Sequence, residues 1–191
     1  MRSSAMDLLD DMKPAMRLPW TTGDFGALSR LFGQRTADEF VSSLDALNGL
    51  QVLDVACGTG GATLPLARRV AQVTGIDLAP NLLHQAEIDA RAAGLEIRFD
   101  EGFAEELPYD DASFDLATSL FGVIFSPFPD RIVSELHRVV RPGGRVAITS
   151  WTPGSFSERS RAATATFMPQ MDPAGPRPFA WGDAEAVGEL L

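Results

Sequence analysis

Hydrophobic and polar positions alternate through the middle of this chain in a way that predicts short strands separated by helices. Runs rich in β-branched and other apolar residues predict five strands, at 51–55, 71–77, 95–99, 113–119 and 144–151. Three of the intervals between them carry apolar residues at helical spacing. An alternation of this kind is typical of βαβ units, in which successive strands are parallel and helices cover the faces of the sheet.

Helices are predicted between these strands at 61–69, 80–93 and 129–140. The last of them ends at Arg141-Pro142-Gly143-Gly144, where a basic final turn precedes proline and glycine, the residues that stop helices. The fifth strand is therefore expected to begin only after this stop signal.

The two ends of the chain differ from this middle region. Residues 1–50 look mostly helical, because the stretches 23–32 and 36–47 each place apolar residues at helical spacing. After Trp151 the sequence becomes rich in proline, glycine and serine. There we expect a loop, a helix near 156–168, a second loop and a final helix from Asp183. The expected organisation is a helical cap at 1–50, a core at 51–151, and a substrate-side loop and helix segment at 152–191 that is incomplete.

Composition narrows the class of protein. A chain of 191 residues with 45% hydrophobic residues can bury the core of one folded domain with some added elements. Its net charge of -10 opposes binding to nucleic acid. Aspartates at positions 7, 10 and 11 interrupt any signal peptide, and no apolar run is long enough to span a membrane, so we expect a cytoplasmic protein. With one cysteine and two histidines, neither an internal disulfide nor a metal site is expected.

The stretch VLDVACGTGG, residues 52–61, carries the first candidate chemistry. Its glycines lie where the first strand turns toward a helix, so a ligand can approach the backbone closely, as in all nucleotide sites of Rossmann type. A dinucleotide fingerprint starting at Gly58 requires a small residue at position 63, where Thr63 stands. Asp54 lies inside the strand. A carboxylate there opposes a pyrophosphate but suits a ligand that carries an ammonium group.

At this point the sequence resembles the class I S-adenosylmethionine-dependent methyltransferases, whose first motif joins an acidic residue to a glycine-rich loop. The match is D-x-A-x-G-x-G, with Ala56 in place of the first glycine. The resemblance continues at Asp77 in GIDLAP, 23 residues after Asp54, where the family binds both ribose hydroxyls. It implies S-adenosylmethionine as the cofactor, and a Rossmann-like, doubly wound sheet with the strand order 3-2-1-4-5.

Further segments match the family along the chain. EGFAEELPYDDASFD resembles the loop beside the adenine base, although Phe103 replaces the acid that usually binds the adenine amino group. SLFGVIFSP and RVVRPGGRVAITSW match the segments around the last two predicted strands, and WTTGDF resembles a loop that folds over the cofactor. Overall the resemblance covers residues 18–155. The cofactor-binding residues it implies are Asp54, Ala56, Cys57, Gly58, Gly60, Asp77, Leu78, Gly102, Phe103, Ala104 and Ser119.

The function implied is methyl transfer to a small molecule. Such an enzyme mainly has to align its substrate with the cofactor and exclude water, so no catalytic residue follows from the sequence. His84 and Tyr109 are candidate bases without a secure position. Aromatic residues expected around the substrate pocket indicate an apolar or aromatic acceptor: Phe121, Phe125, Phe128, Trp151 and Phe156. Two alternatives stay open, a cofactor-binding module that acts through association and an NAD-dependent oxidoreductase.

The fifth predicted strand raises a question about partners. Relatives in this family normally have seven strands, the last two forming an antiparallel pair beyond the fifth, and this sequence shows five. The fifth strand is then expected to have an open, apolar edge, which proteins usually cover or pair. Either the chain is truncated, or the edge is covered, for example by a second copy in a homodimer.

Overall fold

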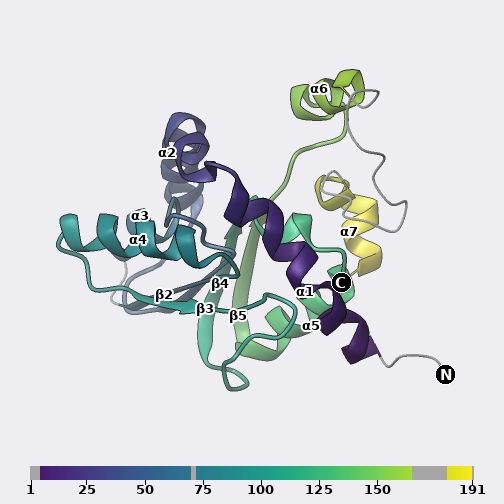
Figure 1. The fold of residues 1–191 in the computed structure, drawn as a ribbon. Helices are drawn as coiled ribbons and strands as arrows, with labels where there is room; N and C mark the ends of the chain where they lie inside the picture. The colour runs from purple at the N-terminus through teal and green to yellow at the C-terminus, as the bar shows by residue number, and fades with distance from the viewer. Residues whose placement is uncertain (1–4, 70–71, 165–179, 191) are drawn as a thin grey trace.

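The central sheet of the molecule has five parallel strands. The computed structural model describes residues 5–69, 72–164 and 180–190. In these residues the strands lie side by side in the order β3-β2-β1-β4-β5 (Figure 1). This confirms the predicted fold class and strand order. The strands are β1 (Gln51–Val55), β2 (Gln72–Asp77), β3 (Arg98–Glu101), β4 (Phe114–Leu120) and β5 (Val140–Thr149).

The predicted start of the third strand was wrong, because its first residue, Leu95, belongs to the end of the preceding helix. Gly94 has a φ of +67° and donates its N–H to Arg91, while the N–H of Leu95 bonds back to the carbonyl of Ala90. These two bonds form a Schellman motif, which satisfies the last carbonyls of the helix. The chain therefore joins the sheet only from Arg98, which pairs with Thr74.

The fifth strand begins earlier than predicted. Val140 already pairs with Phe114, and the register then shifts before Arg145 pairs with Leu116. The predicted stop signal therefore lies within the strand as an irregularity, not before it. Arg141 fixes this bulge, since its guanidinium donates to Asp115 at 2.6 Å and to the carbonyl of Ser113 at 3.0 Å.

Helices lie at both ends of the chain and between the strands. The three predicted between strands are present as α3 (Thr63–Ala67), α4 (Pro80–Ala92) and α5 (Pro129–Val139). Residues 1–50 carry α1 (Ala5–Thr22) and α2 (Phe25–Ser43). Helix α2 joins the two predicted helical stretches into one helix, which ends at Ser43, before the predicted end at residue 47. The remaining helices are the short η1 (Val123–Phe125), α6 (Phe156–Thr164), η3 (Ala180–Gly182) and α7 (Ala184–Leu190). The last four residues of the helix predicted at 156–168 lie outside the described residues.

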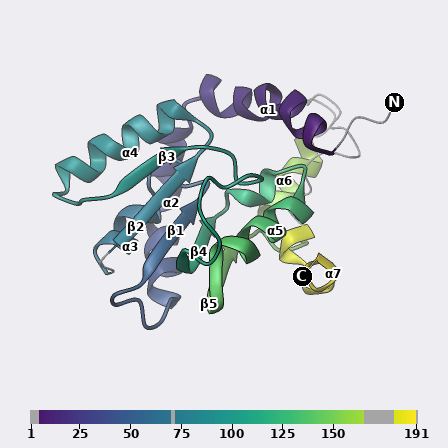
Figure 2. The same ribbon diagram turned by 90° about the horizontal axis from the view of Figure 1, so that it is seen from below.

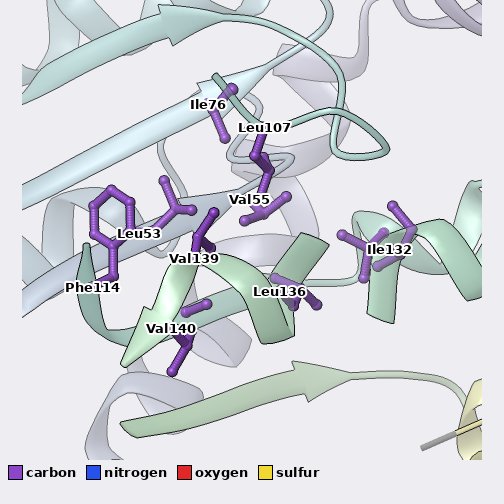
Figure 3. Packing of buried hydrophobic residues seen from close by; sticks show 11 residues of the cluster. Leu53, Val55, Ile76, Leu107, Phe114, Ile132, Leu136, Val139 and Val140 are labelled. Atoms are coloured by element: carbon purple, nitrogen blue, oxygen red, sulfur yellow. The ribbon is translucent and has the colours of Figure 1, made fainter. Parts of the chain in front are cut away.

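The helices divide between the two faces of the sheet, as alternation along the strands requires. Leu53, Val55 and Ala117 pack with Ile132 and Leu136 of α5 (Figure 3). Alternate positions point to the other face. Val52 on β1, Val73 on β2 and Leu116 on β4 pack with Val41 of α2 and Leu66 of α3. Two apolar clusters therefore hold the sheet between α5 on one face and α2 and α3 on the other (Figure 2).

Helix α1 crosses the edge of the sheet at which the parallel strands end (Figure 2). Near its C-terminus, the carbonyl of Trp20 accepts from the side chain of Asn81 at the start of α4, at 3.3 Å. One turn earlier, Arg17 forms an ion pair with Glu101 at the end of β3. The segment predicted to fold over the cofactor, residues 20–25, forms the end of α1 and the turn into α2, where Asp24 accepts from the N–H of Ala27.

Candidate functional site

The predicted cofactor residues gather at one edge of the sheet, where the parallel strands end. β1, β2, β3 and β4 all run in the same direction, so the segments that follow them meet at this carboxyl edge. Asp54 lies within β1, and Ser119 lies within β4. The other predicted residues come from three segments: the loop after β1, the end of β2 with the residue that follows it, and the loop after β3. The eleven residues are Asp54, Ala56, Cys57, Gly58, Gly60, Asp77, Leu78, Gly102, Phe103, Ala104 and Ser119.

The glycine loop after β1 is held in a conformation that side chains rarely adopt. Ala56, Gly58 and Gly60 have φ values of 55°, 56° and 83°. A Cβ added to Gly60 would lie 2.4 Å from a methyl carbon of Leu64, whereas one added to Gly58 would meet no atom within 4 Å. The left-handed backbone thus requires glycine at Gly58 for its conformation and at Gly60 for space as well. At Ala56 the surrounding structure sustains a strained conformation, a feature common at functional sites.

Asp77 locks this loop to the end of β2. One of its carboxylate oxygens accepts from the N–H of Gly58 at 2.8 Å, and the other accepts from the N–H of Ala79 at 2.8 Å. Burial raises the pKa of Asp77, and the backbone donors partly oppose that rise. Since each carboxylate oxygen has two lone pairs, each can accept a further hydrogen bond, such as one from a ribose hydroxyl.

Asp54 occupies a buried network beneath the loop. Its two carboxylate oxygens accept from the hydroxyl of Thr63 at 2.6 Å and from that of Thr118 at 2.8 Å. Burial raises its pKa to about 6, against the effect of both hydroxyls. The carboxylate therefore joins β1 to β4 and to the start of α3. Sequence reasoning missed this network, and its one visible signal was a hydroxyl residue, Thr63, nine positions after Asp54 at the start of the next helix.

Phe103 is covered by two basic residues of α1. Its ring is 8% exposed, with the ammonium of Lys13 at 5.4 Å and the guanidinium of Arg17 at 5.3 Å from the ring centroid. Lys13 also forms an ion pair with Glu106, and Arg17 forms one with Glu101 at 2.7 Å. The two bases are four residues apart and so share one face of the helix. The sequence shows the spacing of these two basic residues but does not show that they contact the ring of Phe103.

Four aromatic rings meet on the other side of the carboxyl edge, and we call them the aromatic cluster: Trp20, Phe121, Phe125 and Trp151. Phe121 stacks on Trp151 with 5.2 Å between ring centroids, and Phe125 contacts both Trp20 and Trp151 edge-on at 5.1 and 5.5 Å. All four are partly buried. Of the five aromatic residues expected around the substrate, three belong to the cluster. Phe156 is 80% exposed, and Phe128 lies under Arg131.

The aromatic cluster and the glycine loop are in contact through Gly122. A Cβ added to Gly122 would lie 2.5 Å from that of Ala56 and 2.8 Å from its carbonyl oxygen. The preceding residue, Phe121, has a φ of 55°, and its N–H donates to Thr149 at 2.9 Å. Ser119 supports the same turn, because its hydroxyl accepts from the N–H of Val123 at 3.1 Å. The two strained residues of the site, Ala56 and Phe121, therefore lie on either side of one close backbone contact.

The two candidate bases are His84, which is exposed on α4, and Tyr109. The other histidine, His137, is exposed on α5. Tyr109 donates its hydroxyl to Asp100 at 2.9 Å, and burial raises its pKa far above the usual range, so it holds its proton. Glu105 is buried at 5% exposure and accepts from Ser126, and burial raises its pKa. It joins the loop after β3 to the segment after β4.

The described part of the chain shows neither a metal-binding group nor a membrane-spanning helix. Residues 5–69, 72–164 and 180–190 contain no group of three or more histidine, cysteine or acidic side chains that could hold a metal ion. None of the helices formed by these residues is long and apolar enough to cross a membrane. Cys57 is a free, buried thiol beside the glycine loop.

Comparison with known proteins identifies the family. A family model described as a methyltransferase domain matches residues 53–148, which is half of the chain. The chain belongs to the class I S-adenosylmethionine-dependent methyltransferases. S-adenosylmethionine is therefore the cofactor expected of this family member.

Relatives of this chain include longer proteins. An uncharacterised protein of Mycobacterium tuberculosis is 36% identical over 175 residues, which cover 92% of this chain and 64% of that protein. A demethylmenaquinone methyltransferase of Thermus thermophilus is 43% identical over 107 residues, covering 54% of this chain and 48% of that one. This chain thus spans less than two thirds of the length of either relative.

The fold also matches a solved methyltransferase structure. The magnesium protoporphyrin IX methyltransferase of Synechocystis superposes with a TM-score of 0.71 and 20% identity, covering 93% of this chain and 88% of that one. At this level of identity the likeness concerns the fold alone.

The residues at the carboxyl edge fit the cofactor of this methyltransferase family. Gly58 leaves open space beside the loop backbone, and both oxygens of Asp77 can accept from hydroxyl groups. In addition, Arg17 has a buried Nε without a hydrogen-bond partner next to Phe103. A polar ligand with hydroxyl donors and ring acceptors matches this set of groups.

Proposed function

We propose that this protein transfers a methyl group from S-adenosylmethionine to a small apolar or aromatic molecule. The aromatic cluster carries this proposal, because its four partly buried rings pack together and Phe121 is followed by Gly122, whose backbone closely approaches Ala56 of the glycine loop. Ring faces and edges of this kind favour planar, apolar ligands. The relative from Thermus thermophilus is named for demethylmenaquinone, and this supports a small organic acceptor.

The proposed cofactor site uses the residues of the glycine loop and of the ends of β2 and β3. Ala56, Cys57, Gly58 and Gly60 bring the loop backbone close to the ligand, while Asp77 and Leu78 lie beside the ribose. Gly102, Phe103 and Ala104 lie beside the adenine base, and Ser119 shapes the turn that approaches the methyl group. Asp54 supports the loop from below and contributes a negative charge for an ammonium group.

The work of the chain in this reaction is binding, orientation and the exclusion of water. When bound, S-adenosylmethionine supplies a methyl group on a positively charged sulfur that leaves as a neutral thioether. Helix α1, the turn at Phe121 and the segment after β5 supply the rings of the aromatic cluster, and the acceptor is proposed to bind there. Holding an acceptor atom about 3 to 3.5 Å from the methyl carbon in the correct line accounts for most of the acceleration that such sites provide. No base is assigned.

We also propose that the chain works as three parts and pairs with a second copy. The parts are a helical cap at 1–50, a cofactor-binding core at 51–151 and a substrate-side segment at 152–191. In the described residues β5 pairs only with β4, and Val146 on this edge strand is 45% exposed. Pairing of two β5 edges covers such a strand. Light scattering should then give the mass of a dimer for the wild type and of a monomer for Val146→Lys, and a wild-type monomer refutes the pairing.

The proposed function is tested by binding and then by turnover. Calorimetric titration of the purified chain should give micromolar affinity for S-adenosylmethionine and S-adenosylhomocysteine, and no binding of NAD. A panel of small aromatic acceptors is then assayed for methylation. Cofactor binding without methylation of any acceptor favours a binding module that acts through association. Binding of NAD alone favours an oxidoreductase.

A further inference from the structure

Arg17 on α1 is held by two contacts, and neither of them uses its Nε. Its Nη2 pairs with Glu101 at 2.7 Å, and the central carbon of its guanidinium lies 5.3 Å from the centroid of the Phe103 ring. A guanidinium is planar and rigid, so these two contacts also fix the direction of the Nε–H. Arg17 is thus preorganised at the end of β3, next to the segment that the proposed function assigns to the adenine base.

The Nε of Arg17 is the exceptional polar atom of this site. Among the residues that the structure describes, it is the one buried side-chain nitrogen or oxygen that lacks a hydrogen-bond partner. Burying a donor without an acceptor is unfavourable, and native structures contain few such groups. Because this donor lies beside a proposed ligand site, a hydrogen-bond acceptor on the bound ligand can satisfy it.

The chemistry of the neighbourhood indicates which acceptor this is. Glu101 already neutralises the charge of Arg17, so a neutral acceptor suffices. The base of the cofactor offers such acceptors, since its ring nitrogens have lone pairs while its amino group is a donor. Phe103, with its apolar ring, cannot accept from that amino group. The side chain at position 103 therefore does not bind the amino group of the base, and the ring nitrogens are the acceptors that Arg17 can recognise.

Resting on the proposed function, we propose that the Nε–H of Arg17 donates a hydrogen bond to a ring nitrogen of the adenine base. Arg17 is then a specificity-determining residue that reaches the cofactor from the N-terminal helix. Phe103 provides the surface against which its guanidinium is held.

Lys13 offers a matched control on the same helix face. Its ammonium also lies near the ring of Phe103 and also forms an ion pair across to the core, with Glu106. A second carboxylate, Asp10, binds it at 2.7 Å. Lys13 therefore resembles Arg17 in charge and position but has no buried donor left without a partner.

The test combines ligand analogues with variants of the full chain. Affinities are measured by calorimetry for S-adenosylhomocysteine and for its 1-deaza, 3-deaza and 7-deaza analogues, in each of which one ring nitrogen is replaced by C–H. We expect one of the three analogues to bind the wild type about tenfold more weakly than the parent compound, since one hydrogen bond is lost. That difference should vanish in Arg17→Lys and persist in Lys13→Met. Circular dichroism verifies the fold of both variants.

The outcomes separate this inference from the proposed function. If the folded wild type does not bind S-adenosylhomocysteine at all, the proposed function fails, and this inference fails with it. If the parent compound binds and all three analogues bind equally well, Arg17 makes no such bond, while the proposed function stands. A difference that persists undiminished in Arg17→Lys assigns the bond to another donor and also overturns the inference. If a variant does not fold, equal binding of all three analogues by the wild type still overturns the inference.

Discussion

The two sides of the carboxyl edge are built from different interactions. On the cofactor side, Asp77 and Asp54 use both of their carboxylate oxygens on donors from the protein, which fixes the backbone before any ligand arrives. On the acceptor side, the aromatic cluster is held by ring contacts between residues from three separate segments. Hydrogen-bond geometry is directional, whereas ring packing tolerates rearrangement. The geometry of the cofactor side therefore depends on the backbone of the fold, whereas the geometry of the acceptor side depends on which side chains pack there.

The largest effect is expected from Asp77→Ala, which breaks the cofactor side. It leaves the N–H groups of Gly58 and Ala79 without an acceptor, at a cost of roughly 2 to 5 kcal/mol in the free energy of unfolding. Cofactor affinity should fall at least tenfold. Urea unfolding and calorimetry measure the two effects, and Asp77→Asn, which keeps one acceptor oxygen, should lie between wild type and alanine. Unchanged affinity in the alanine variant would remove Asp77 from the site.

A somewhat smaller effect concerns the pH dependence contributed by Asp54. Its pKa is about 6 in the folded chain and 3.8 ordinarily, so the folded state favours the protonated form. The stability that this preference provides is complete below pH 3.8 and is lost as the pH rises through 6. The loss amounts to roughly 3 kcal/mol.

The variant Asp54→Asn isolates this contribution. An amide carries no charge in either state, so the difference in unfolding free energy between the variant and the wild type should shift in favour of the variant between pH 4 and pH 7. Groups far from Asp54 are present in both proteins and cancel in the comparison, whereas Asp77, whose charge helps to raise the pKa of Asp54, contributes its coupling to the measured difference. Parallel curves for the two proteins across this range would contradict the buried position of an ionisable Asp54.

Gly122→Ala is expected to disturb the contact between the two sides. The new methyl group would lie within 3 Å of two atoms of Ala56, so the loop or the turn must move, at a cost of about 1 to 3 kcal/mol in stability. We expect weaker binding of both cofactor and acceptor, by calorimetry and by steady-state kinetics. Gly188→Ala serves as the control, since its added Cβ meets no atom within 4 Å. If only acceptor binding weakens, the two sides are less tightly joined than the contact indicates.

The smallest effect is expected from Trp151→Ala, a change on the acceptor side alone. Trp151→Ala removes one stacked and one edge-on ring contact, worth about 1 kcal/mol each beyond the buried area. The KM of an aromatic acceptor should rise several-fold, with the dissociation constant of S-adenosylhomocysteine within twofold of wild type. Phe156→Ala, which removes an exposed ring, should leave both values unchanged. A matching loss of cofactor affinity in Trp151→Ala would show that the aromatic cluster also serves the cofactor.

The difference between the two sides also explains what the sequence could predict. The strand order and the residues around Gly58 and Asp77 follow from local motifs, since backbone turns and strand ends depend on neighbours in the sequence. The partners of Asp54 and Phe103 do not, because Thr118 and Arg17 come from distant segments and meet them only through tertiary packing. For the same reason the sequence indicated aromatic residues near the acceptor but not Trp20 among them.

Errors in the predicted bounds had local causes. Leu95 appeared to be part of a strand because it is apolar, but its N–H completes the end of α4. The run from Arg141 to Gly144 appeared to be a stop, yet the guanidinium of Arg141 holds it in the sheet as a bulge. Both cases turn on a single hydrogen-bonding group whose partner the pattern of hydrophobic residues does not reveal.

The composition of the aromatic cluster gives the protein an optical readout of its own. Of the three tryptophans in the chain, Trp20 and Trp151 belong to the cluster, while Trp181 packs against the apolar core. Indole emission depends on the polarity around the ring, so a molecule that enters among Trp20 and Trp151 changes the fluorescence of an unlabelled sample. Because Gly182, the neighbour of Trp181, lies against the backbone of Trp151, the variant Trp181→Phe separates the emission of the third tryptophan from that of the cluster. Candidate acceptors can thus be ranked by titration before any of them has been shown to react.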